Sequence, residues 1–478
     1  MLNKRTAAMS ATLKPVPALV TVLIGLVIWF VPPPEGVDPK AWHLLAIFVA
    51  TIVGIILKAL PMGAMAIIAI ALTALTRTLR VGDSLSGFAN TTIWLIVLAF
   101  FVARGFIKTG LGRRIAYLFV ALLGKRSLGL GYGLVATDLV LAPAIPSNTA
   151  RAGGVVFPIM RSLAHAFQSE PDDGSARKIG SYLSKTAFQG TVITSAMFLT
   201  AMAANPLIVK FAADQGITLT WAGWAIAASV PGIVSLIVVP LVIYVLYPPE
   251  IKETPAATQL ARRELQNMGP VSPHEWIMLA VFALLLVLWI FAPQLGGINA
   301  TTTAMTGLLV LLVTGVLTWQ DLLEEKGAWD TLVWFSALVM MATFLNKLGL
   351  IPWFSKEVGG MLAGTYWVTA FLILTLVYFY SHYFFASQTA HISAMYAAFL
   401  AVALALGVPP LFAALVLAFS SNLFSSLTHY GTGPAPVYFG AGYVELRTWW
   451  GLGFVISLVN IVIWVGLGGI WWKVLGLW

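Results

Sequence analysis

Long, uninterrupted apolar runs constrain this chain more than any other feature. Of the 478 residues, 59% are hydrophobic and only 9% are charged, whereas soluble domains carry about 25% charged residues. Many runs approach the roughly 20 residues that a helix needs to cross a bilayer. They are continuous rather than alternating, which favours helices over a closed barrel. The sequence therefore predicts an all-α polytopic membrane protein.

The remaining composition narrows the setting. The chain has no cysteine, which excludes disulfides, thiol chemistry and cysteine-ligated metals. Its net charge of +9 comes from residues scattered through short loops, which is typical of cytoplasmic loops rather than of nucleic-acid binding. Lys4 and Arg5 precede a first apolar run at about 16–31, and Pro32–Pro34 replaces a cleavage site. We expect an uncleaved first span, a cytoplasmic N-terminus and a bacterial plasma membrane, since no organelle transit segment precedes the run.

The two halves of the chain repeat each other. A polar linker at 248–273 separates them, and Asp38–Trp42 opens one apolar run as Ser272–Trp276 opens another. Phe106–Leu111 likewise has a counterpart in Leu345–Leu350. About eleven crossings fit the apolar runs, which would place the C-terminus outside and invert the second repeat. Such repeats are typical of secondary transporters.

Each half contains a predicted re-entrant hairpin, at about 128–164 and 367–407, with a polar tip. The tips are Ser147–Arg151 and Ser387–His391, and both read Ser-x-Thr-Ala followed by a basic residue. Each serine has the chemistry of an N-cap, so the returning helix would point unpaired N–H groups and its positive dipole end at a bound anion. An arginine at such depth costs about 2.5–3.5 kcal/mol or more, which favours a functional role.

Each hairpin is followed by an apolar run that Gly or Pro interrupts, at Asn205-Pro206 and at Thr432-Gly433-Pro434. Matched interruptions in two repeats indicate a transporter binding site. His429 lies beside the second interruption and is a possible coupling residue, as is Asp138 in the first hairpin. The predicted substrate-binding residues are Ser147, Asn148, Thr149, Arg151, Ser387, Gln388, Thr389, His391, Asn205, Pro206, Thr432, Gly433 and Pro434.

Structural readings of the same residues stay open. Polar hairpin residues also join helices, and Arg151 would serve equally as an ion-pair partner of Asp138. His391 and His429 would then be hydrogen-bonded interior histidines, and the interruptions simple kinks.

At these tips and interruptions the chain resembles the divalent anion:sodium symporter family. The resemblance rests on Ser147-Asn148-Thr149, on Ser387-Gln388-Thr389 and on Thr428–Pro436, and is greatest to exchangers of citrate/succinate, tartrate/succinate and 2-oxoglutarate/malate. It implies a homodimer of eleven-span protomers, each with a scaffold and a transport domain that moves as an elevator. Both tips would hold carboxylates.

Five segments follow from this architecture. They are a scaffold at 1–90, a first transport part at 91–220 with an interrupted span at about 186–213, a scaffold and linker at 221–330, a second transport part at 331–447 with an interrupted span at about 409–440, and a last span at 448–478.

A basic residue in each tip predicts how transport is coupled. Arg151 is always charged and His391 would be protonated beside an anion, so a bound dicarboxylate would neutralise a site that is costly to move when empty. We expect sodium-independent exchange of malate, succinate, 2-oxoglutarate, citrate or tartrate. Sodium- or proton-driven symport and an anion channel are the alternatives. An enzyme, a metal site and a cofactor are not expected, because no nucleophile pair or metal-ligand spacing is present.

Overall fold

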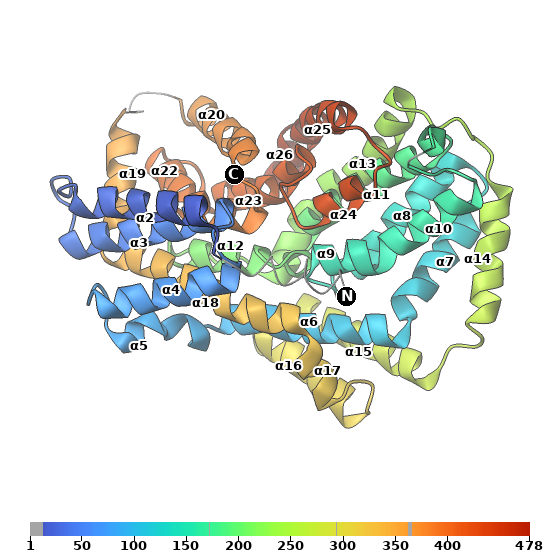
Figure 1. Ribbon diagram of the computed structural model, residues 1–478, viewed down its shortest axis with the longest axis horizontal. Helices are drawn as coiled ribbons and strands as arrows, with labels where there is room; N and C mark the ends of the chain where they lie inside the picture. Colours follow the sequence, from blue (N-terminus) through green and yellow to red (C-terminus); the bar gives the residue numbers. More distant parts are fainter. Residues whose placement is uncertain (1–12, 172, 293, 362–365) are drawn as a thin grey trace.

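The computed structural model describes residues 13–171, 173–292, 294–361 and 366–478. Lys4 and Arg5, on which the expected cytoplasmic N-terminus depends, lie outside these ranges. Throughout them the chain is helical, and the only extended pairing is an isolated bridge between Arg126 and Glu253 (Figure 1). The predicted all-α class is confirmed.

The helices of the two repeats follow one another in matching order. The first repeat contains α2 (Pro15–Phe30), α3 (Pro39–Ile56), α4 (Met62–Leu75), α5 (Val81–Ser84), α6 (Thr91–Thr109), α7 (Leu111–Leu123), α8 (Ser127–Leu141), α9 (Asn148–Arg151), α10 (Phe157–Ala166), α11 (Gly180–Met197), α12 (Asn205–Ala213) and α13 (Trp221–Leu246). After the linker helix α14 (Pro255–Asn267), the second contains α15 (Pro273–Ile290), α16 (Ala300–Val313), α17 (Trp319–Glu324), α18 (Lys326–Lys347), α19 (Leu350–Met361), α20 (Trp367–Tyr380), α21 (Gln388–His391), α22 (Ala397–Ala405), α23 (Pro410–Leu423), α24 (Pro434–Gly440), α25 (Leu446–Ile461) and α26 (Gly468–Val474).

Length and composition make this a multi-pass membrane protein. Among the described residues, eight helices are long and apolar enough to cross a bilayer, and five shorter apolar helices accompany them. The outward faces are apolar as well: Val16, Val27 and Phe30 of α2 are 69%, 63% and 78% exposed. Such side chains are stable only against lipid or a partner chain. The count of about eleven crossings stays a prediction.

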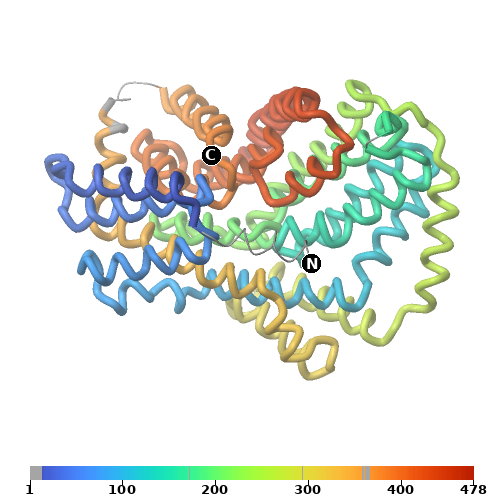
Figure 2. Tube along the Cα trace, viewed as in Figure 1, coloured from blue at the N-terminus to red at the C-terminus, as the bar shows by residue number. Residues whose placement is uncertain are grey.

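Two groups of helices enclose the middle of the molecule. α2, α3 and α4 pack in sequence and reach α18, which also packs on α6, and α6 packs against α15 and α16. On the other side, α8, α10 and α13 pack around α11, while α7 joins α8 to the outer helix α14 (Figure 2). The five predicted domain boundaries stay predictions.

Two helical hairpins lie at the predicted places and match in detail, while their re-entrant course through the membrane stays a prediction. The first consists of α8 and the helix that returns from Asn148 to Ala166, and the second of α20 and the helix from Gln388 to Ala405. In each returning helix a π-helical turn begins directly after the basic residue, at Ala152–Val156 and at Ile392–Tyr396. Such π-helical turns are rare and frequently accompany functional sites.

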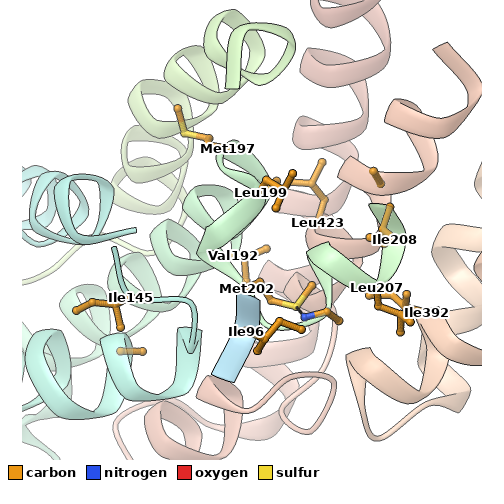
Figure 3. Close-up of a cluster of buried hydrophobic side chains, with 14 of the residues drawn as sticks. Ile96, Ile145, Val192, Met197, Leu199, Met202, Leu207, Ile208, Ile392 and Leu423 are labelled. Carbon is orange, nitrogen blue, oxygen red and sulfur yellow. Dashed lines mark hydrogen bonds between the residues drawn. The ribbon is translucent and has the colours of Figure 1, made fainter. Parts of the chain in front are cut away.

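The interrupted spans meet behind the hairpin tips. α11 ends at Met197 and the chain resumes as α12 at Asn205, while α23 ends at Leu423 and α24 begins at Pro434. Apolar side chains from both halves fill the space between them, including Ile145, Met202 and Ile392 (Figure 3). Inside this core Asn422 donates from Nδ2 to Oδ1 of Asn205 over 2.8 Å, which joins the two halves by a buried polar contact.

Candidate functional site

The two hairpin tips have the same capping geometry. The Ser147 Oγ accepts from the backbone N–H of Ala150 at 3.1 Å, and the Ser387 Oγ accepts from that of Ala390 at 3.3 Å. The next backbone N–H, of Arg151 or His391, donates to the carbonyl of the same serine. In each tip, the two backbone N–H groups between the capping serine and the first capped N–H have no hydrogen-bond partner among the described residues. They are those of 148–149 in the first tip and 388–389 in the second. Four backbone donors thus remain for a ligand.

Thr432, in the second interruption, links the tips to each other. Its hydroxyl donates to the Gln388 Oε1 at 2.9 Å and accepts from the Asn148 Nδ2 at 3.2 Å. Gln388 is held from its other end, because its Nε2 donates to the carbonyl of Ser421 at 2.8 Å. The longer side chain of glutamine suits this double contact. The two tips and the second interruption therefore form one connected polar wall.

A cavity of about 690 Å³ opens in front of this wall, a size typical of small-molecule sites. On its other side lie residues of α3, α4, α6 and α18, among them Phe100 and Trp334. Lys14 and Lys58 also line it and both are exposed, whereas no acidic residue of the described ranges lines it. Neither lysine has an ion-pair partner within the described ranges. The cavity thus combines neutral donors with positive charge, which suits an anion.

The structure brings most of the predicted residues together. Those that line the cavity are Ser147, Asn148, Thr149, Ser387, Gln388, Thr389, Thr432 and Gly433. Those that do not are Arg151, His391, Asn205, Pro206 and Pro434.

The interruption residues outside the cavity lining have structural contacts. Asn205 donates from Nδ2 to the carbonyls of Ser195 and Phe198, so it fixes the interruption from inside. Pro206 lines a different cavity beside Trp221. Pro434 is buried as the first residue of α24, where its missing N–H costs nothing.

Arg151 corrects the expectation of free charge in the cavity. Its side chain is fully buried behind the first tip, and its Nε lies 2.9 Å from the Asp138 Oδ1. Its Nη1 donates to the carbonyls of Ile145 and Ala201, both at 2.8 Å. Asp138 compensates the guanidinium, so the empty site carries no unpaired arginine charge. Exchange therefore does not follow from the charge of Arg151.

His391 is also buried, behind the second tip, where its ring stacks on Phe424 with centroids 4.5 Å apart. Its Nδ1 lies 3.0 Å from the Nδ1 of His382. His429 stands apart from both: it is half-buried and accepts from the Trp450 Nε1 at 3.1 Å, and it does not line the cavity.

Three residues near the site escaped the sequence reasoning. Lys14 and Lys58 lie about ninety or more residues before the first tip, and nothing in the sequence places them opposite it. His382 had one usable signal, because it lies nine residues before His391 in a segment, 358–444, that contains no Asp, Glu, Lys or Arg. Two histidines so close together in a segment without other charged residues are a signal of a functional site.

Known proteins with similar sequences agree with this architecture. The family model of the sodium:sulfate symporter transmembrane region matches residues 13–478. YflS of Bacillus subtilis (strain 168), provisionally named a malate transporter, is 62% identical over 479 residues and 100% of both chains. Dicarboxylate transporter 1 of the Spinacia oleracea chloroplast is 56% identical over 97% of this chain and 82% of its own length. The inner membrane protein YbhI of Escherichia coli is 39% identical over 96% and 97%.

Solved structures add the fold. The Alcanivorax borkumensis YdaH transporter aligns with a TM-score of 0.55 at 16% identity, over 95% of this chain and 98% of its own. At that identity the likeness concerns the fold alone. The family match and the relatives confirm the predicted resemblance, and they confirm that the chain is no enzyme, since they are transporters. This multi-pass membrane protein belongs to the sodium:sulfate symporter family, the divalent anion:sodium symporters.

Proposed function

We propose that this protein exchanges dicarboxylates such as malate, succinate and 2-oxoglutarate, or the related citrate and tartrate, across the bacterial plasma membrane. The observation that carries the proposal is the cavity itself: two capped helix N-termini face it with four unpartnered backbone N–H groups, two lysines line it, and no carboxylate does. Two separate tips suit an anion with two carboxylates, one for each. The names of the relatives, a malate transporter and a dicarboxylate transporter, support the same substrate class.

Sodium independence is supported by what surrounds Arg151. Its guanidinium contacts the Asp138 carboxylate, two backbone carbonyls and the hydroxyls of Thr194 and Ser195. Carboxylate, carbonyl and hydroxyl oxygens are also the ligands that hard metal cations prefer. A fixed positive group already occupies this oxygen cage, so no dissolved cation is needed there. The first tip is thereby stabilised without an ion that must enter and leave.

Exchange follows from the tips rather than from Arg151. When the site is empty, the N–H groups at 148–149 and 388–389 rely on water, and moving them through a water-poor barrier leaves them unsatisfied at a cost of about 1–3 kcal/mol each. A bound dicarboxylate satisfies them. The loaded site should cross far more readily than the empty one, which makes transport an exchange.

An elevator motion of the two hairpins and the two interrupted spans, within a homodimer, completes the proposal. It is supported by the polar contacts that join these elements, and by the placement of Trp334 on α18 and of Lys58 in the turn after α3, across the cavity. The proposed orientation has the N-terminus in the cytoplasm and the C-terminus outside.

Counterflow in proteoliposomes tests this function. Purified protein is reconstituted with or without internal succinate, and entry of labelled succinate is followed with Na⁺ or K⁺ as the external cation. We expect rapid entry only into vesicles that contain succinate, at equal rates in both salts. Entry that needs a sodium gradient and no internal succinate would identify a symporter, the alternative function. Non-saturating entry without counterflow would identify a channel.

A further inference from the structure

His391 of the second tip and His382, which precedes this tip, belong to one continuous chain of hydrogen bonds. His382, at the end of the hairpin's first arm, places its Nε2 at 3.0 Å from the carbonyl of Gly431 and its Nδ1 at 3.0 Å from the Nδ1 of His391. The Nε2 of His391 lies 3.2 Å from the hydroxyl of Ser381. The chain thus runs from the second interruption, through both rings, to a partly exposed serine.

For two neutral rings, these contacts determine which nitrogen of each ring carries a hydrogen. A carbonyl only accepts, so the His382 Nε2 carries a hydrogen and donates it to Gly431. In a neutral His382 the Nδ1 is then an acceptor, and the His391 Nδ1 must donate to it. The Nε2 of His391 is left to accept from the hydroxyl of Ser381. When both rings are neutral, each is therefore in a single tautomer.

The same chain of hydrogen bonds can hold one more proton without losing any of its hydrogen bonds. If His382 takes a proton on Nδ1, it donates from both nitrogens, and His391 moves its own hydrogen from Nδ1 to Nε2. His391 then accepts at Nδ1 and donates to the Ser381 Oγ, and that hydroxyl turns its own hydrogen to the carbonyl of Tyr378, 2.9 Å away. A further proton would set two N–H groups against each other across 3.0 Å. The capacity of the pair is one proton.

The surroundings provide stacking but no counter-charge. Phe424 stacks on both rings, with centroids 3.9 Å from His382 and 4.5 Å from His391, and an aromatic face stabilises a nearby cation. No Asp, Glu, Lys or Arg occurs from 358 to 444. Other titratable or charged groups lie on the elements around the pair. On the second hairpin and in the second interruption these are Tyr378, Tyr380, Tyr383, Tyr396, His429 and Tyr430. On the neighbouring helices, or in the turns directly after them, they are Lys58, Lys210, Asp214, Lys326, Asp330, Lys347, Lys356 and Glu357.

We propose that His382 and His391 form a binding site for a single proton, which is taken up from water when a dicarboxylate binds at the tips. His391 lies one helical turn, about 5.4 Å along the axis, from the cap Ser387. The dianion supplies the missing counter-charge, and the proton reduces the net charge of the tips with their bound dianion from −2 to −1. Arg151 and Asp138 have no such capacity, because their charges already cancel. This inference rests on the proposed dicarboxylate site.

Calorimetry tests proton uptake directly. Succinate is titrated into the full-length protein in nanodiscs between about pH 6 and 8, in buffers that differ in ionisation enthalpy. The dependence of the binding heat on that enthalpy counts protons, after correction for the ionisation of free succinate. We expect uptake that approaches one proton per succinate at its maximum, and in that pH range the dissociation constant should rise by up to about tenfold per pH unit. Succinate binding with no uptake across this range would overturn the inference, whereas absence of any succinate binding would overturn the proposed function instead.

Two variants locate the proton. In His382→Gln/His391→Gln the amides can still donate to Gly431 and bond to each other, but neither can take up a proton, so we expect succinate binding without uptake. His382→Asn/His391→Gln should behave alike and serves if the first variant does not fold. His429→Gln is the matched control, since this third histidine lies beside the same interruption and should leave the uptake unchanged. Uptake that survives in the double variant, or disappears in His429→Gln, would contradict the assignment to the pair.

Discussion

Replacing Arg151 with glutamine should destabilise the protein. The guanidinium is fully buried, and its removal leaves the Asp138 carboxylate, which is 1% exposed, without its counter-charge. Breaking a buried ion pair from one side costs about 3–5 kcal/mol. Unfolding entropy of about 2.1 cal/mol/K per residue gives roughly 1 kcal/mol/K for a chain of this length. The midpoint of thermal unfolding should therefore fall by roughly 3–5 °C.

The assay is thermal unfolding of the purified protein in detergent, with four variants side by side: Arg151→Gln, Asp138→Asn, the double variant of both, and a control. In Asp138→Asn/Arg151→Gln no charge is left unpaired, so the double variant should be more stable than the sum of the single effects predicts, by about 0.5–3 kcal/mol. Arg447→Ala removes an exposed arginine and should change stability by less than about 0.5 kcal/mol.

A specific result would refute this reasoning. If Arg151→Gln unfolds at the wild-type temperature yet no longer binds succinate, the guanidinium contacts the substrate and the ion pair has no structural role. Loss of binding together with reduced stability would fit the buried position, because the ion pair supports the tip from behind.

Three further perturbations follow from the structure. Lys58→Gln should raise the KM for succinate roughly three- to tenfold, with kcat little changed, because about 1 kcal/mol of attraction between close charges in a water-exposed site is lost. An unchanged KM, or an equal rise in the control Lys40→Gln at the far end of α3, would remove Lys58 from the site. Gly433→Ala should weaken succinate binding about two- to tenfold, because the new Cβ would lie 2.0 Å from the Thr149 Oγ1 and displace that hydroxyl. The control Gly440→Ala places its Cβ in open space and should leave succinate binding unchanged. Burial raises the pKa of Asp321, but hydrogen bonds from Lys108 and Thr318 outweigh it and lower that pKa to about 2. Because this pKa is below that of the unfolded chain, the carboxylate should add about 1 kcal/mol to the free energy of unfolding above about pH 4, after allowance for the exposed Lys108. This contribution should be lost as the pH falls toward about 2. Denaturation curves of Asp321→Asn that keep the wild-type pH dependence would contradict this.

The sequence predicted the local features of the site well. Ser147 and Ser387 cap their helices as their chemistry requires, and the first hairpin extends over 127–166 where 128–164 was predicted. These features depend on neighbours a few residues away, which a single sequence displays directly.

Side-chain direction and long-range partners were less accessible. Arg151 shares a tip with Thr149, but a rotation within one turn of helix turns it away from the cavity toward Asp138, thirteen residues earlier in the other arm. The relative register of two hairpin arms decides that contact, and no periodicity reports it. The placement of Lys58 depends on packing between distant helices, which sequence spacing does not encode.

The polar links across the site limit which acids fit it. Thr432 connects both tips, and Asn422 is bonded to Asn205 behind them, so the two recognition surfaces keep a fixed separation. A fixed separation of this kind selects ligands by their length. Short-chain diacids that bridge the gap with both ends satisfied would be accepted, while monoacids of the same length would leave one tip without an anion and be rejected.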